Sequence, residues 1–310
     1  MNGEEARRVL REINRKFVER YEKIDGSDEF FIYTARRLRQ SVRVNTLKVE
    51  LEVGVENLRT RFELEPVPWC REGFWVSGGR VSTTAEHALG VVFIQEAASM
   101  LPVVALEVEP GMHVLDVAAS PGGKSTQIAQ YLENRGCLVA NEPKPRRLGV
   151  LAANLQRCGV LVARVTQMDG RRFQEFPERF DRVLLDAPCS NAGMVRKSYR
   201  YLQAWGRRRA KKLSKLQKQL ILAAYTALKP GGVMVYSTCT LEPVENEEVV
   251  DHLLRNTDAE VEDIRVRINS HPPFEEFEGR SYTSEVRRCL RIHPQDNDTE
   301  GFFVARVRKP

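Results

Sequence analysis

The segment Val114–Thr126, Val-Leu-Asp-Val-Ala-Ala-Ser-Pro-Gly-Gly-Lys-Ser-Thr, constrains the fold of this 310-residue chain more than any other. Its apolar start is typical of a strand that helices cover on both faces of a parallel sheet. The turn Ser120–Gly123 ends the strand, and its two glycines let backbone N–H groups at the next helix approach a ligand closely. Asp116 lies at the carboxyl end of the strand, where open α/β sheets place their ligand crevice. The segment therefore predicts an α/β fold with a ligand site at this turn.

This turn fits two kinds of ligand. Residues 118–125 differ at one position from the phosphate-binding loop of ATPases, because Ala118 takes the place of its first glycine. Asp186, which follows the apolar residues Val183–Leu185, would then be the acidic metal ligand of such an ATPase. In the second interpretation the turn holds S-adenosylmethionine (SAM), and acidic residues at neighbouring strand ends hold its ribose and adenine. The turn alone leaves both interpretations open.

The later strands favour SAM. Four successive expected strands end at acidic residues, and a fifth ends at a cysteine: Asp116, Glu142, Asp169, Asp186 and Cys239. An acidic residue about 20 positions after a glycine turn is placed to accept hydrogen bonds from ribose hydroxyls. Glu142 has that position, and Asp169 is placed to accept from the adenine amino group. A carboxylate repels phosphate, which argues against a nucleotide-phosphate site. Any one of these acids alone could simply cap the next helix, but the ordered set predicts a SAM site.

Strands and helices alternate regularly from Met112 onward. Short connections of this kind imply parallel strands with right-handed crossovers. We expect residues 91–310 to form a Rossmann-like, SAM-dependent methyltransferase fold, with a seven-stranded, mostly parallel sheet and helices on both faces. Its first elements should be a short strand and a helix at Phe93–Ser99. Residues 1–90 should form a small α+β domain that either contacts the substrate or packs as a cap.

Two cysteines, Cys189 and Cys239, follow expected strand ends beside the crevice. The six cysteines of the chain form no C-x-x-C pair, so we expect neither disulfides nor a zinc site. A thiolate that adds to carbon 6 of a cytosine turns the ring into an enamine, which can accept a methyl group at carbon 5. Such a thiol needs a lowered pKa, which we expect from Lys124 and from the basic residues after Val195. One cysteine alone would be interpreted as a core residue, but two beside a SAM turn favour catalysis.

With these residues the chain resembles the NSUN group of RNA cytosine-5 methyltransferases, from about Val44 to the C-terminus. The resemblance lies in the motifs Arg43–Thr46, Gln95–Ser99, Asp116–Lys124, Asp186–Ser190, Leu216-Gln217, Lys229–Gly232, Tyr236–Thr240 and Glu245–Glu247. Two departures lie beside these motifs: Asn191 follows Asp186–Ser190 where the family usually has glycine, and Val244 stands where glutamate is common.

The resemblance implies a role for each matching residue. Cys239 would be the nucleophile at carbon 6, Cys189 would assist product release, and Asp186 and Lys124 would contact the base and the reacting centre. The residues expected to hold SAM are Ala118, Ala119, Ser120, Pro121, Gly122, Gly123, Lys124, Glu142, Arg147, Asp169 and Asp186. The implied substrate is a cytosine in structured RNA, either tRNA or rRNA.

The segment Val195–Lys218 contains ten basic residues and no acidic one, and without them the net charge of +6 would become −4. Tyr199, Tyr201 and Trp205 lie among these cations. Cations neutralise phosphates and aromatic rings stack on unpaired bases. We therefore expect Arg196–Arg209 to form an RNA-holding loop, whereas Lys211–Lys218 fits an ordinary solvated helix face equally well.

No apolar segment is long enough to span a membrane, so we expect a cytoplasmic protein. We also expect it to be a monomer and to bind no metal. An ATPase and a catalytically silent RNA-binding protein of the same fold are the two alternatives. His293 is expected to be structural.

Overall fold

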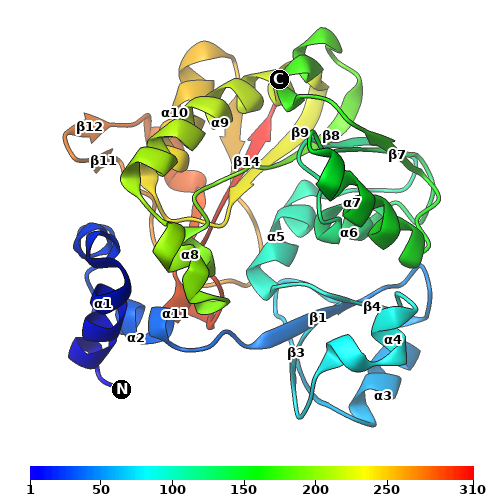
Figure 1. Ribbon diagram of the computed structural model, residues 1–310. Helices are drawn as coiled ribbons and strands as arrows, with labels where there is room; N and C mark the ends of the chain where they lie inside the picture. The colour runs from blue at the N-terminus through cyan, green and yellow to red at the C-terminus, as the bar shows by residue number, and fades with distance from the viewer.

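The computed structural model describes residues 1–310 and is built around one twisted sheet (Figure 1). Seven strands lie in the order β10-β14-β9-β8-β5-β6-β7, and β13 pairs with β14 as an eighth. The five strands from β9 to β7 are parallel, whereas β14, β10 and β13 are antiparallel. The strands are β5 (His113–Asp116), β6 (Cys137–Asn141), β7 (Ala163–Thr166), β8 (Phe180–Asp186), β9 (Leu228–Thr238), β10 (Glu260–Glu262), β13 (Leu290–Ile292) and β14 (Phe302–Arg308). The predicted mostly parallel methyltransferase sheet is confirmed, with β13 as an additional short strand.

Helices cover both faces of this sheet, because alternate strand residues point in opposite directions. Val114 packs in one core with helices α5, α6 and α7, and Leu115 packs in a second core with α9 and α10. These helices are α5 (Ala97–Leu106), α6 (Gly123–Tyr131), α7 (Pro145–Arg157), α9 (Arg207–Ala227) and α10 (Glu247–Asn256). The two cores fix the sheet between helical layers, so the carboxyl ends of β5, β6, β8 and β9 form one rigid edge.

A second, antiparallel sheet has the order β2-β3-β1-β4 and packs against α3. Its strand β4 pairs with β1, so this sheet extends past residue 90 to Ile94. The strand that we expected to open the second domain thus lies in the N-terminal sheet. The elements are β1 (Gln40–Val44), β2 (Glu63–Pro66), β3 (Gly73–Ser77), β4 (Val92–Ile94), α3 (Leu51–Arg59) and α4 (Ala85–Ala88).

The first two helices, α1 (Gly3–Tyr21) and α2 (Asp28–Ala35), pack away from the small sheet. Their apolar residues share a core with Val195, Leu202, Trp205 and Leu241, which belong to the segments that follow β8 and β9 in the large domain. Asn14 interrupts the helical backbone of α1, and its amide donates to the carbonyl of Leu202 at 2.8 Å. The remaining short elements are α8 (Tyr199–Ala204), α11 (Pro294–Asn297), β11 (Glu276–Phe277) and β12 (Arg280–Ser281). None of the helices combines the length and apolar composition needed to cross a bilayer.

Candidate active site

Arg43 of the N-terminal sheet packs against the turn between β5 and α6 and hydrogen-bonds to it. This fully buried guanidinium donates to Thr126 Oγ1 at 2.8 Å and to Gln95 Oε1 at 3.0 Å. Gly122 has φ +107°, a conformation that favours glycine, and Gly123 starts α6. The motif around Arg43 therefore positions the turn rather than taking part in chemistry.

Three of the residues expected at the SAM site lie together beside this turn. The Ser120 hydroxyl donates to the Arg147 carbonyl at 3.1 Å, and the Arg147 guanidinium returns a hydrogen bond to the Ser120 carbonyl. The same guanidinium lies 3.2 Å from Glu142, whose side chain is buried and also accepts from the backbone of Lys144. Glu142 thus keeps lone pairs free, because each carboxylate oxygen has one partner here and can accept more.

Asp116 lies under the turn with one oxygen unpaired. Its Oδ2 accepts from Ser125 at 2.6 Å, while its Oδ1 is buried without a hydrogen-bond partner. Burial raises the pKa of Asp116 to about 7, against the hydrogen bond from Ser125. A buried polar atom without a partner is costly, so it fits a site in which a ligand supplies the missing donor.

The partner of Asp169 is Arg171 and none of the residues named above. Asp169 caps the short helical turn Gly170–Glu175 and pairs with the Arg171 guanidinium at 2.5 Å, with 43% of its side chain exposed. The hydrogen bond from Arg171 lowers the pKa of Asp169. The neighbouring Asn141 was missed by sequence reasoning, and its amide joins the carbonyls of Val117 and Met168 at 3.0 Å each. Its position directly before Glu142, at the strand end, was the available signal.

Lys124 and Asp186 form an ion pair across the edge of the sheet. The Lys124 ammonium lies 2.7 Å from Asp186 and 2.8 Å from Ser99 Oγ, and Ser237 Oγ donates to the second oxygen of Asp186 at 2.8 Å. Burial alone would lower the pKa of Lys124, but the charge and hydrogen bond of Asp186 outweigh it and raise that pKa. The Lys124 ammonium is therefore held in its charged form.

The two cysteines meet at this edge. Cys189 Sγ and Cys239 Sγ lie 3.0 Å apart as free thiols, and Asn191 Oδ1 lies 3.1 Å from the Cys239 sulfur. The contact with Cys189 and burial raise the pKa of the Cys239 thiol well above its usual value. The expected lowering of this pKa is thus wrong for the site in this structure, because the nearby charges of Glu300 and Asp186 also raise it.

Two glycines and a buried glutamate brace the cysteine loops. The Gly193 N–H donates to the Cys239 carbonyl at 2.9 Å, and a Cβ on Gly193 would lie 1.9 Å from the Gly301 carbonyl oxygen. Glu245 accepts from the backbone N–H of Ser190 at 2.9 Å and from Gln217 at 3.2 Å. Burial raises the pKa of Glu245 to about 7. The Gln217 and Glu245 motifs therefore hold the loop that carries Cys189.

The basic segment differs from expectation at its start. Arg196 is buried and donates to the Thr299 carbonyl at 2.8 Å, and Trp205 packs edge-on against Phe17 at 5.3 Å. These two residues are structural, so the predicted RNA-holding loop at Arg196–Arg209 is wrong for them. The exposed cations of the segment lie on both sides of Trp205: Lys197, Arg200, Arg207, Arg208, Arg209, Lys211, Lys212 and Lys215.

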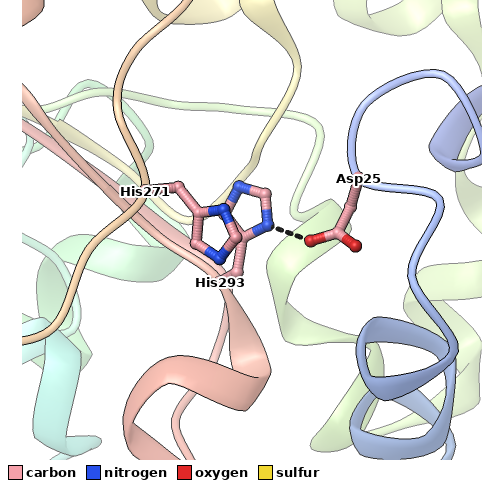
Figure 2. Close-up of side chains that lie close together, drawn as sticks. All are labelled: Asp25, His271 and His293. Atoms are coloured by element: carbon pink, nitrogen blue, oxygen red, sulfur yellow. Dashed lines mark hydrogen bonds and ion pairs between the residues drawn. The ribbon is translucent and has the colours of Figure 1, made fainter.

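A separate cluster joins the two ends of the chain (Figure 2). His293 Nδ1 lies 2.5 Å from Asp25, and the His271 and His293 rings stack with centroids 4.0 Å apart. Lone pairs of stacked rings lie in parallel planes, so they do not converge on one ion. Burial lowers the pKa of His293 to about 4, against the hydrogen bond with Asp25. His293 is therefore a neutral, structural residue, as expected.

Comparison with known proteins identifies the family. The model for 16S rRNA methyltransferase RsmB/F matches residues 103–308, and that for the N-terminal domain of 16S rRNA methyltransferase RsmF matches residues 13–97. The chain belongs to the RsmB/F methyltransferase family. It is 52% identical to the tRNA (cytosine(49)-C(5))-methyltransferase of Pyrococcus abyssi, over 97% of this chain and 98% of that protein. It is 44% identical to the ribosomal RNA small subunit methyltransferase F of Vibrio campbellii, but it spans only 59% of that protein's length.

Solved structures agree with this membership. A methyltransferase homologue from Pyrococcus horikoshii has a TM-score of 0.84 and 34% identity, covering 96% of this chain and 95% of its own. NSun6 from the same organism, solved with SFG, has a TM-score of 0.80 over 98% of this chain and 97% of its own; at 22% identity it shows the fold alone. The RsmB/F protein described here is thus a SAM-dependent RNA cytosine-5 methyltransferase, as predicted, and the ATPase alternative is excluded.

Proposed function

We propose that this RsmB/F protein methylates cytosine 49 of tRNA, with Cys239 as the nucleophile at carbon 6 and Cys189 as the group that assists release. The near-complete match to the P. abyssi enzyme, at 52% identity over both chains, carries the choice of tRNA. The 3.0 Å contact between the two sulfurs supports the assignment of paired roles. A cytoplasmic location and a monomeric state stay predictions.

The residues around the turn fit SAM. We assign its ribose to Glu142, its remaining contacts to Ala118–Gly123 and Arg147, and we keep Asp169 as the expected adenine contact. The unpaired Asp116 Oδ1 and the free lone pairs of Glu142 are acceptors for hydroxyl and ammonium donors of such a ligand. SAM supplies an electrophilic methyl group when it is bound.

The chain's own residues then handle the base. The Cys239 thiol gives its proton to water, and the resulting thiolate adds to carbon 6, which makes carbon 5 nucleophilic. Asp186 is held by Lys124 and Ser237, and we assign it to the base: its carboxylate accepts from the cytosine amino group, and in its protonated form it would donate to the ring nitrogen. After methyl transfer, water takes the proton on carbon 5, the electron pair of that C–H bond re-forms the double bond between carbons 5 and 6, and Cys239 leaves as a thiolate. Cys189 lies close enough to this sulfur to assist the last step.

The experiment that tests this function is covalent trapping on denaturing gels. Cys189→Ala with SAM and a tRNA transcript is expected to give a heat-stable protein–RNA adduct, because attack and methylation proceed but release stalls. Cys239→Ala should give none, and a transcript with uracil at position 49 should give none with either variant. An adduct in Cys239→Ala alone would exchange the two roles, and adducts with rRNA but not tRNA would contradict the choice of substrate.

We place the tRNA backbone on the exposed cations of α9. Lys211 and Lys215 line a cavity of about 350 Å³ beside the loop that follows Cys239, and neither is in an ion pair. Charge reversal of both should weaken tRNA binding and reduce its dependence on salt, since each phosphate contact releases counterions. Reversal of the exposed Arg164 on β7 is the matched control, and equal losses in both variants would contradict this surface.

A further inference from the structure

We propose that Asn191 is a positioning residue that holds the two active-site thiols in their protonated form until the target base enters. The inference rests on the proposed function only in naming Cys239 as the nucleophile. It concerns a residue outside the motifs that the family resemblance matched.

A single amide oxygen lies within hydrogen-bond distance of both sulfurs. Asn191 Oδ1 is 3.1 Å from Cys239 Sγ and 3.5 Å from Cys189 Sγ, and the sulfurs are 3.0 Å from each other. A carbonyl oxygen can only accept, so the nearer thiol, Cys239, donates to it, and the single S–H of Cys189 is shared between this oxygen and the Cys239 sulfur. The three groups thus form one small network at the point where carbon 6 of the base has to arrive.

The backbone of Asn191 is what allows this contact. Its φ of +60° and ψ of +28° lie in the left-handed region, which asparagine and glycine adopt with little strain. The next residues are fixed, because Gly193 is wedged between Cys239 and Gly301. Asn191 therefore points its amide at the sulfurs by local geometry rather than by chance rotation of an exposed side chain.

A hydrogen bond donated by a thiol stabilises the thiol over the thiolate. The thiolate is the form that attacks, so the amide keeps Cys239 unreactive while the site is empty of base. A base that displaces the amide oxygen would free the sulfur at the moment when it is needed. Asn191 thereby limits adventitious alkylation and oxidation of Cys239, the more accessible of the two thiols.

The test is the pH dependence of iodoacetamide alkylation of Cys239, followed by peptide mass spectrometry, with half-buried Cys137 as the internal reference. Asn191→Gly removes the amide at a backbone conformation that glycine accepts. We expect the midpoint of the curve of alkylation rate against pH to move to lower pH. Below this midpoint alkylation should be about five- to tenfold faster, which corresponds to the free energy of one lost hydrogen bond. Asn191→Asp keeps an acceptor and adds charge, so its midpoint should move to higher pH.

An unchanged or higher midpoint in Asn191→Gly would overturn the proposal, and so would an unchanged or lower midpoint in Asn191→Asp. SAM affinity serves as the folding control for both variants. Because alkylation needs neither RNA nor SAM, its outcome is independent of the adduct assay. Failure of that assay with a normal alkylation shift would reject the proposed function and leave the role of Asn191 intact.

Discussion

Lys124 and Asp186 form an ion pair of 2.7 Å that joins the start of α6 to the end of β8, with 11% and 32% of their side chains exposed. The pair links the turn assigned to SAM with the loop that carries Cys189. A mostly buried pair of this kind is costly to break from one side, because the remaining charge stays buried alone.

Removal of both partners should therefore cost less than the sum of the two single removals. We expect Lys124→Met and Asp186→Asn each to lower the free energy of unfolding by about 2–4 kcal/mol, and the double variant to lose less than their sum. Chemical denaturation of the four proteins measures this coupling. Additive losses would mean that the two charges do not interact in solution. Both single variants should also lose methyl transfer.

The pH dependence of stability should contain a contribution from His293. Its folded pKa of about 4 lies below the usual 6.5, so the unfolded chain binds the proton first as the pH falls. The contribution is complete above pH 6.5 and is lost between pH 6.5 and 4. It amounts to at most about 3 kcal/mol.

The comparison of wild type with His293→Gln isolates this group from the buried acids, Asp116 and Glu245, whose raised pKa values act in the opposite direction. The stability difference between the two proteins should be larger at pH 7 than at pH 4.5. A difference that does not change with pH would contradict a neutral, buried His293.

Gly193 offers a steric prediction with a control in the same chain. A Cβ at Gly193 would lie 1.9 Å from the Gly301 carbonyl oxygen, whereas a Cβ at Gly149, within α7, meets nothing within 4 Å. Gly193→Ala should lower the melting temperature and methyl transfer together, because the loop of Cys239 has to shift. Gly149→Ala should raise stability by about 0.5–1 kcal/mol, as expected for a helix interior.

Local pattern was enough to predict the sheet and the ends of its strands. The apolar segments that end at Asp116, Glu142 and Asp186 each form a strand or its immediate continuation, because a strand buried on both faces needs an uninterrupted apolar sequence. The meeting of the ends of β5, β6, β8 and β9 at one edge followed from the same logic, since the strands are parallel.

Contacts between distant segments were not predictable in this way. Trp205 lies among cations in the sequence, yet it is buried by Phe17 of the first helix, far away along the chain. The raised pKa of Cys239 likewise depends on Cys189 coming within 3.0 Å, which no spacing in the sequence encodes. Burial and side-chain pairing across the fold decide such properties, and composition alone does not.

Glu142 and Asp169 both follow strands, but one acidic side chain is buried and the other is exposed. Glu142 is buried and holds Arg147 beside Ser120, whereas Asp169 is exposed and already paired with Arg171. Loss of a charged, buried acceptor costs more than loss of an exposed one that water replaces. We therefore expect Glu142→Gln to raise the Kd for SAM about tenfold or more, and Asp169→Asn to raise it by about threefold or less. Isothermal titration with SAM measures both. A larger loss in Asp169→Asn would show that Arg171 releases Asp169 on binding, which would make Asp169 the dominant contact.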